Sequence, residues 1–320
     1  MRMIIHLGLP KSASSTLQVG LSACEGIIFL GLYPTCNVAE VPNQNFEHME
    51  IPYLKDSRIK DFYAGFSFAK YDSRVQAELY QSICSDYADA DKALFFSCEA
   101  LTSPMFSEVT PKVKLERLVE CCDDAEFLLI SRNQEDVIKS QYRDWPFDLS
   151  VKGGRGLNLN EWCLNELRRS DDMGPGRWFD YQRLLEPLQG QFADGRLHVL
   201  LFEDFVHARE RFCADLASLL KVDSALVEAC LADVQANRGV SARYNAYRKF
   251  RRLLPASFSM RSIMPKPLLN SAFRFLNRGE AEVLELDDAV RDQLVEHFSA
   301  SNRAVAEQLK LSLEGKGYWV

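Results

Sequence analysis

The sequence predicts an α/β protein with a mainly parallel sheet flanked by helices, followed by a helical C-terminal region. Short apolar runs alternate with amphipathic helical patterns up to Phe202, which is typical of parallel strands joined by helices. Beyond Phe202 the patterns are helical only. The chain has 320 residues, 47% of them hydrophobic, and can bury one large core. We therefore expect one domain over residues 1–320, in which 239–320 forms a helical, basic C-terminal extension.

The chain begins with an apolar run, Met3–Leu7, which predicts a strand that leads through a loop into a helix near Thr16. A second short strand is expected within Ile27–Leu32. The segment Tyr33–Ser73 is rich in Pro, Asn and aromatic residues and has no clear period, so we expect irregular structure there.

From Arg74 onward strands and helices alternate regularly. Further strands are expected at Ala93–Ser97, Glu126–Ser131 and Leu197–Phe202. Helices are expected near Arg74–Tyr87, Pro111–Cys122, Gln134–Trp145, Leu159–Arg169, Trp178–Leu188, Ala208–Leu220, Ser224–Val234, Tyr244–Leu254 and Asp287–Leu309. The stretch Pro255–Pro267 is expected to be a linker or a mobile flap. Ligands of parallel sheets bind beyond the carboxyl ends of the strands, so the loops after Leu7, Ser97 and Ser131 should converge.

The cysteines, the histidines and the lengths of the apolar runs indicate which classes of protein are not expected. The nine cysteines are odd in number, form no Cys-x-x-Cys pair and lie mostly within apolar patterns, so we expect reduced core thiols. The five histidines are scattered without ligand spacing, so no metal is expected. No run approaches the roughly 20 apolar residues that cross a bilayer, and the apolar start is too short for a signal peptide. These features favour a cytoplasmic protein.

The net charge of −7 conceals a strong asymmetry. Between Gly239 and Gly279 there is no acidic residue, whereas nine of the 38 basic residues fall there, so the remaining 29 face 45 acidic residues and leave −16 elsewhere. The basic stretch 243–278 fits a solvated helical face, a groove for an acidic glycan, or a peripheral membrane contact through an amphipathic helix. Nucleic acid is disfavoured as a partner because the rest of the chain is acidic.

The loop from Gly8 to Thr16 has the composition of an anion cradle. A Gly/Ser-rich turn between a strand and a helix presents backbone N–H groups and hydroxyls to a phosphate. The ATPase P-loop places its lysine at the end of the loop, whereas Lys11 comes early and is followed by hydroxyl residues. The alternative is an ordinary capped helix start with a surface lysine.

This run resembles the 5'-phosphosulfate-binding loop of sulfotransferases, whose pattern is Pro-Lys-[Ser/Thr]-Gly-Thr-Thr-x-Leu. The resemblance implies a P-loop NTPase-like fold, 3'-phosphoadenosine-5'-phosphosulfate (PAPS) as donor and 3'-phosphoadenosine 5'-phosphate (PAP) as product. It implies that Lys11 is catalytic and that the 5'-phosphate is held by Lys11, Ser12, Ala13, Ser14, Ser15 and Thr16. Ala13 stands where the family has glycine, and alanine weakens the grip if that position needs a positive φ.

A second motif runs from Leu128 to Tyr142, where a buried strand ends at Arg132 and a helix carries Ser140. It is similar to the 3'-phosphate-binding motif of the same family, an arginine followed by a serine eight residues later. The resemblance implies that Arg132 and Ser140 share one phosphate, which the helix geometry permits. Taken alone, such a pair is more often a surface ion pair and a helix serine. Gln134 replaces the common proline, which the first helical turn tolerates.

Glu99 follows the apolar strand Leu94–Ser97, at the expected site. Glycan sulfotransferases carry a glutamate in a similar segment, where it serves as general base, so the resemblance implies a catalytic role for Glu99. Its neighbours Phe96 and Leu101 should raise its pKa through desolvation. The alternatives are that Glu99 caps the next helix or pairs with an arginine. His48 is the fallback base.

Softer matches extend the resemblance over most of residues 1–234. Arg238 lies in a segment similar to the one that folds over the donor nucleotide in this family, so it is a candidate phosphate contact. The last helix of the chain, with Asn302, resembles the closing helix of the family more loosely. The leading hypothesis is a PAPS-dependent sulfotransferase acting on a hydroxyl or amine, with a carbohydrate acceptor by family analogy. The alternatives are a non-catalytic nucleotide- or glycan-binding protein and a small-molecule kinase. Tyr33–Ser73 and Lys152–Gly156, expected to shape the acceptor pocket, carry no recognisable motif.

Overall fold

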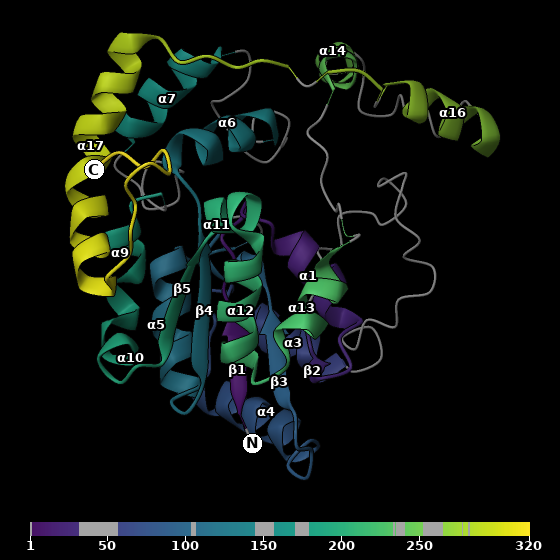
Figure 1. The fold of residues 1–320 in the computed structure, drawn as a ribbon, viewed down its shortest axis with the longest axis vertical. Helices are drawn as coiled ribbons and strands as arrows, with labels where there is room; N and C mark the ends of the chain where they lie inside the picture. Colours follow the sequence, from purple (N-terminus) through teal and green to yellow (C-terminus); the bar gives the residue numbers. More distant parts are fainter. Residues whose placement is uncertain are drawn as a thin grey trace.

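The centre of the molecule is a five-stranded sheet in which every pairing of neighbouring strands is parallel. The computed structural model describes residues 2–31, 57–103, 107–144, 157–169, 179–232, 234, 241–251, 265–276, 278–280 and 282–320. The strands are β1 (Met3–His6), β2 (Ile27–Phe29), β3 (Ala93–Ser97), β4 (Glu126–Ser131) and β5 (Leu197–Leu201). Their spatial order is β2-β3-β1-β4-β5 (Figure 1). The predicted parallel α/β fold is therefore confirmed.

Helices cover both faces of the sheet, because successive strand residues are buried on opposite sides. Ile5, Phe96 and Leu129 belong to one core cluster, and their neighbours Ile4 and Phe95 belong to the other. The first core is closed mainly by α3 (Ser57–Gly65), α4 (Ser73–Ser85), α5 (Pro111–Cys121) and α9 (Tyr181–Leu185). The second is closed by α1 (Ser14–Ser22), α12 (Arg209–Leu220) and α13 (Ser224–Ala232). Burial on both faces explains why the strands read as continuous apolar runs.

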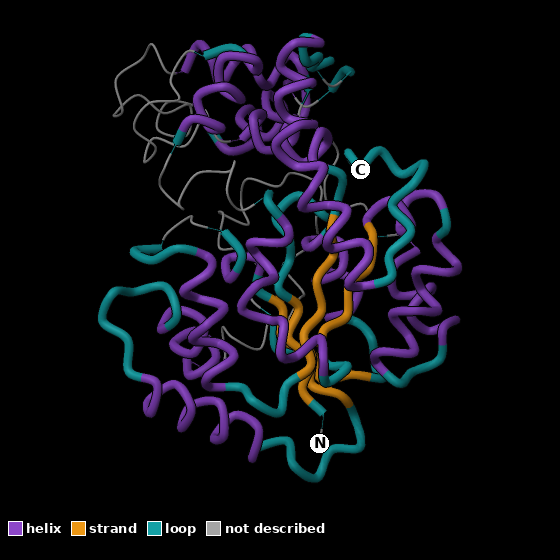
Figure 2. Tube along the Cα trace, turned by 90° about the vertical axis from the view of Figure 1, so that its left-hand side faces the viewer, coloured by secondary structure: helices purple, strands orange, loops and turns teal. Residues whose placement is uncertain are grey.

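A third core lies beyond the carboxyl ends of the strands. It is built from α6 (Gln134–Asp144), α7 (Leu159–Arg168) and the long helix α17 (Asp288–Leu309), with Trp162 and Phe298 fully buried. The remaining elements are η3 (Glu99–Leu101), η5 (Glu186–Leu188), α10 (Gln189–Ala193), α11 (Phe202–His207), α14 (Ala242–Arg251) and α16 (Lys266–Leu276). Figures 1 and 2 both place α14 and α16 at the end toward which the strands run.

Local signals account for several helix starts. Asp72 caps α4 by accepting from the backbone N–H groups of Arg74 and Val75. Thr110 caps α5, whose first residue is a proline. Asn158 opens α7 in a capping box. These caps lie within one or two residues of the predicted boundaries because capping is a local interaction.

Three predicted elements are corrected. The segment Tyr33–Ser73 was expected to be irregular, yet it contains α3, which buries Ile59, Phe62 and Tyr63 at helical spacing. The single helix predicted at Trp178–Leu188 is split into α9 and η5, because Pro187 has no N–H for helical pairing, and α10 follows beyond the predicted end. Phe202 starts α11 and does not extend β5. Trp178, Trp145 and 252–254 lie outside the described residues.

None of the helices in the described part of the chain combines the length and apolar character needed to cross a membrane.

Candidate active site

Three loops meet at the carboxyl edge of the sheet because β1 lies between β3 and β4. His6, the last residue of β1, is in register with Ser97 on one side and Leu128 on the other. Gly8 has a φ of 102°, and a Cβ added there would lie 3.2 Å from Glu99 Cα. Only a glycine lets the loop after β1 approach the turn after β3 so closely. The predicted convergence of these loops is confirmed.

The loop after β1 is held by hydrogen bonds to β4. The Leu9 N–H donates to the Ile130 carbonyl at 3.1 Å, and the Ile130 N–H donates to the Gly8 carbonyl at 2.7 Å. The Ser14 hydroxyl donates to the Leu9 carbonyl at 2.8 Å. Because this bond occupies the only hydroxyl proton of Ser14, that side chain stabilises the loop and is not free to donate to a phosphate. Thr102 adds a further bond to the Leu7 carbonyl at 2.8 Å.

The N-terminus of α1 opens into this loop without a side-chain cap. Ala13 is the N-cap residue and makes no side-chain cap bond, and the first turn contains no acidic residue. Such a terminus keeps its N–H groups and its dipole available to an anion. Ser15 is half-buried and Thr16 is buried beside these N–H groups. Ser12 is fully buried, and its hydroxyl has no hydrogen-bond partner among the described residues.

Ala13 and Lys11 both have positive φ angles, 63° and 68°. The position where glycine was expected therefore does require the left-handed conformation, which is unfavourable for alanine. This strain is local to the anion-binding loop, and it identifies Ala13 as a residue whose replacement by glycine should relax the loop.

A buried polar group, absent from the sequence-based predictions, lies beneath the loop. His6 Nδ1 lies 2.8 Å from Ser97 Oγ, which also accepts from Gln18 Nε2 at 3.0 Å. Burial lowers the pKa of His6 to about 3, so the ring is neutral. The group ties β1, β3 and α1 together. The adjacency of His6 and Ser97 in register is the signal that could have revealed it.

Arg132 connects the second motif to the first. Its Nη1 donates to the Lys11 carbonyl at 2.8 Å, and its guanidinium lies over the Phe202 ring, 4.3 Å from the centroid. Asp136 Oδ2 is 3.5 Å from Nη2. The buried Nε has no hydrogen-bond partner among the described residues. Ser140 is half-buried on α6, one helical turn beyond Asp136, so it lies on the same side of the helix.

The backbone around Arg132 is anchored by pairings that sequence reasoning missed. The N–H and the side-chain amide of Asn133 both donate to Glu203 Oε1, at 2.8 and 2.9 Å. Tyr181 donates its hydroxyl to the Arg132 carbonyl. Gln134 and Asn302 exchange two side-chain hydrogen bonds, at 2.6 and 3.0 Å, which ties α17 to α6. No local pattern signals these pairs.

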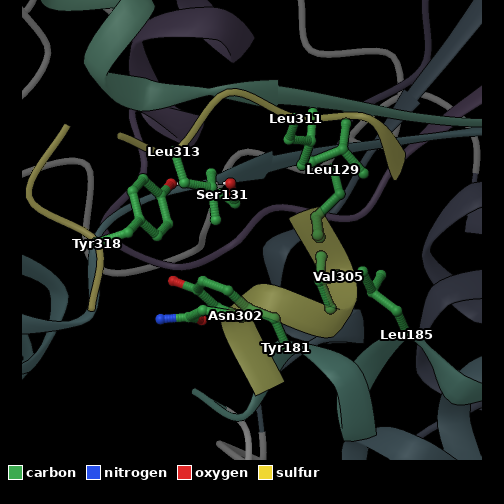
Figure 3. A pocket seen from close by; sticks show the side chains of 10 residues that line it. Leu129, Ser131, Tyr181, Leu185, Asn302, Val305, Leu311, Leu313 and Tyr318 are labelled. Atoms are coloured by element: carbon green, nitrogen blue, oxygen red, sulfur yellow. Dashed lines mark hydrogen bonds between the residues drawn. The ribbon is translucent and has the colours of Figure 1, made fainter. Parts of the chain in front are cut away.

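A small cavity behind the end of β4 belongs to this support structure (Figure 3). The hydroxyl oxygens of Ser131 and Tyr318 are 2.9 Å apart and form a hydrogen bond on its wall, and Asn302 and Tyr181 also line it. Burial raises the pKa of Tyr318 well above its ordinary value, so the phenol stays protonated. The enclosed space suits about one water molecule and no larger ligand.

Glu99 begins η3, half-buried, with Phe96 and Leu101 buried on either side of it in the chain. The turn is held by Lys114, a fully buried side chain on α5 whose Nζ donates to the carbonyls of Ala100 and Ser103. Burial lowers the pKa of Lys114 to about 8. Lys114 positions the turn that carries the candidate base, and it was not predicted.

Two of the residues singled out from the sequence, a candidate phosphate contact and the fallback base, cannot be placed. Arg238 and His48 lie outside the described residues. Within the described ranges, no three His, Cys, Asp or Glu side chains gather in a way that could hold a metal ion. The candidate site thus comprises Lys11, the start of α1, Glu99 and Arg132 at the loops after the strands, with Ser140 farther along α6.

Comparison with known proteins shows the fold. No protein-family model matches the sequence, and no curated protein matches it. The crystal structure of a sulfotransferase from Alicyclobacillus acidocaldarius matches 98% of this chain and 97% of that chain, with 15% identity and a TM-score of 0.52. The sulfotransferase domain of the Synechococcus PCC 7002 olefin synthase matches 93% and 94%, with 16% identity and a TM-score of 0.41. The chain therefore has a sulfotransferase-like fold over nearly its whole length.

Proposed function

We propose that this protein is a sulfotransferase that moves a sulfuryl group from PAPS to a hydroxyl or amine of an acceptor. One observation carries the proposal: the arginine of the second motif donates a hydrogen bond to the backbone of the first, from Arg132 to Lys11, at 2.8 Å. Two anion-binding elements far apart in the chain thus face one edge of the sheet. A nucleotide with phosphates at both ends of its ribose matches such a pair.

The start of α1 is suited to the 5' end of the donor. Its uncapped N–H groups, the hydroxyls of Ser15 and Thr16, and the ammonium of Lys11 are the groups that bind a phosphate ester at a helix N-terminus. The Ser14 hydroxyl is bonded to the Leu9 carbonyl and supports the loop, whereas the buried Ser12 hydroxyl has no partner among the described residues and remains a candidate donor. Of the hydroxyls that the sequence predicts to hold the 5'-phosphate, that of Ser14 is therefore no longer expected to contact it.

Arg132 and Ser140 are suited to the 3'-phosphate. The guanidinium is preset by the Phe202 ring and the Lys11 carbonyl, so little side-chain freedom is lost when a phosphate binds. The unpaired Nε indicates that the chain does not use the full donor capacity of this arginine. A ligand that lacks a 3'-phosphate would leave that capacity unused, which favours PAPS over ATP.

The chemistry needs in-line attack and stabilisation of the leaving group. Glu99 would accept the acceptor's proton as the acceptor oxygen forms its bond to sulfur. The bond from sulfur to the bridging oxygen breaks, its electron pair remains on the 5'-phosphate, and Lys11 would stabilise that charge. Lys114 supports Glu99 by holding η3. The carbohydrate class of the acceptor follows from the family resemblance.

Calorimetric titration tests the donor site. The protein should bind adenosine 3',5'-bisphosphate at least about tenfold more tightly than adenosine 5'-phosphate or ATP, because a charge-assisted bond to the 3'-phosphate contributes about 1.5–3 kcal/mol. Lys11→Ala and Arg132→Ala should each weaken this binding about tenfold or more. The matched controls Lys92→Ala and Arg211→Ala, both exposed, should bind like the wild type.

The alternatives give different results. Tighter binding of ATP would indicate a kinase and contradict the proposal. Tight binding of the bisphosphate without transfer in a screen of carbohydrate, alcohol and amine acceptors, read by mass spectrometry with labelled donor, would indicate a non-catalytic binding protein. Product carrying the label identifies the acceptor directly.

A further inference from the structure

Helices α14 and α16 form a packed pair that lies apart from the sheet (Figures 1 and 2). Phe273 of α16 contacts Tyr244 and Tyr247 of α14, with ring centroids 6.1 and 6.3 Å apart. The Ser241 hydroxyl donates to the Leu276 carbonyl, which ties the start of one helix to the end of the other. The aromatic residues on the inner side therefore account for the pairing.

The pair also exposes large apolar side chains outside the Tyr244–Tyr247–Phe273 contact. Leu268 and Phe275 are 58% and 60% exposed and lie seven residues apart, on one side of α16. Phe250 of α14 is 58% exposed. Among the described residues, these three are the most exposed large hydrophobic side chains apart from Val283. Isolated exposed apolar residues are ordinary, but three on one helix pair mark an interaction surface.

The charge of the same segment is entirely positive. Residues 239–279 contain nine basic residues and no acidic one. Arg243 is exposed and lies over the Phe275 ring, 5.1 Å from its centroid, so a cation and an apolar ring share one patch. Arg278 is exposed just beyond α16. A partner must therefore offer dense negative charge together with an apolar layer.

We infer that α14 and α16 bind an anionic lipid surface. Apolar side chains flanked by Lys and Arg on an amphipathic helix insert at the headgroup boundary, while the cations pair with anionic lipids. An acidic polysaccharide would match the cations but not Leu268, an aliphatic side chain. A second copy of the chain would place one positive surface against another. The helix pair lies at the end toward which the strands run, so this binding brings the candidate active site near the membrane.

Sedimentation with vesicles tests the inference in the full-length protein without donor or acceptor, so it is independent of the proposed sulfuryl transfer. The protein should sediment with vesicles of phosphatidylcholine and phosphatidylserine, and not with phosphatidylcholine alone. The bound fraction should fall about tenfold or more in the double variant Leu268→Asp/Phe275→Asp, which removes the apolar side chains. It should fall by a similar factor in the double variant Arg243→Glu/Arg278→Glu, which reverses two charges and leaves the apolar side chains in place. Phe68→Asp, at an exposed phenylalanine in the turn after α3, is the matched control and should bind like the wild type.

Four outcomes would overturn the inference. The first two are that the protein does not bind anionic vesicles, and that both double variants bind them as well as the wild type does. The third is that the protein binds a sulfated glycan in preference to vesicles. The fourth is that light scattering shows a dimer that the Leu268→Asp/Phe275→Asp variant no longer forms. Circular dichroism of each variant checks that it is folded. If the apolar variant is unfolded, the charge variant decides the question alone.

Discussion

The carboxyl edge of the sheet and the α14–α16 pair both carry basic side chains, but they hold them differently. At the edge, Lys11 lies on a loop bonded to β4, and Arg132 is fixed by a carbonyl and an aromatic ring. On the helix pair, Arg243 and Arg278 are exposed. A small ligand bound in one orientation needs the first arrangement, and an extended anionic surface needs only the second. Single substitutions should therefore have large effects at the edge and small ones on the pair.

The largest effect is expected at Glu99. Glu99→Gln should lower kcat about 10²-fold or more, because removal of a general base costs about 10²–10⁴ in rate, while affinity for adenosine 3',5'-bisphosphate stays unchanged. Steady-state kinetics and calorimetry on the same preparation measure both. Glu108→Gln, on a neighbouring surface segment, is the control. Unchanged transfer with every accepted substrate would remove Glu99 from the mechanism.

The buried group under the loop should make the stability of the edge depend on pH. The pKa of His6 is about 3 in the folded protein and 6.5 ordinarily, so between these values the unfolded chain binds a proton that the folded chain does not. Stability should therefore fall as the pH falls from 6.5 toward 3. His6→Asn should show a shallower decline in denaturant titrations across this window. The exposed His207→Asn should decline like the wild type, and an unchanged slope in His6→Asn would contradict the assignment.

A smaller gain is expected at Ala13. Ala13→Gly should raise the free energy of unfolding by about 0.5–1 kcal/mol, because glycine adopts the observed φ of 63° without steric cost. The same change should strengthen bisphosphate binding if the strain opposes closure of the loop on a phosphate. Ala100→Gly, at an exposed position in η3, provides the comparison and should not stabilise the protein. A destabilised Ala13→Gly variant would show that the loop conformation carries no strain.

The smallest effect is expected on the helix pair. Arg243→Ala should change affinity for adenosine 3',5'-bisphosphate and the free energy of unfolding by no more than about 0.5 kcal/mol, since exposed single charges contribute little. Calorimetry beside Arg132→Ala makes the comparison direct. A loss at Arg243 as large as that at Arg132 would mean that the helix pair belongs to the donor site, and the contrast between the two regions would fail.

Much of the fold was predictable from the sequence because strand and helix periods are local. The strands Ala93–Ser97 and Glu126–Ser131 were predicted at their observed ends, and the loop after β1 was identified from Lys11 and the hydroxyl residues that follow. Helix α3 was missed because the whole segment Tyr33–Ser73 was expected to be irregular from its Pro, Asn and aromatic residues, although the helix itself contains no Pro or Asn. The role of each candidate site residue in binding or catalysis stays a prediction.

The sequence by itself determined the succession along the chain of the strands and most helices, the two motifs and the concentration of positive charge near the end of the chain. Only the tertiary structure decided which side chains support those motifs. His6 meets Ser97 across 91 residues, Asn133 meets Glu203 across 70, and Arg132 reaches Lys11 across 121. Such pairings depend on which strands lie side by side, and local propensity carries no information about that order.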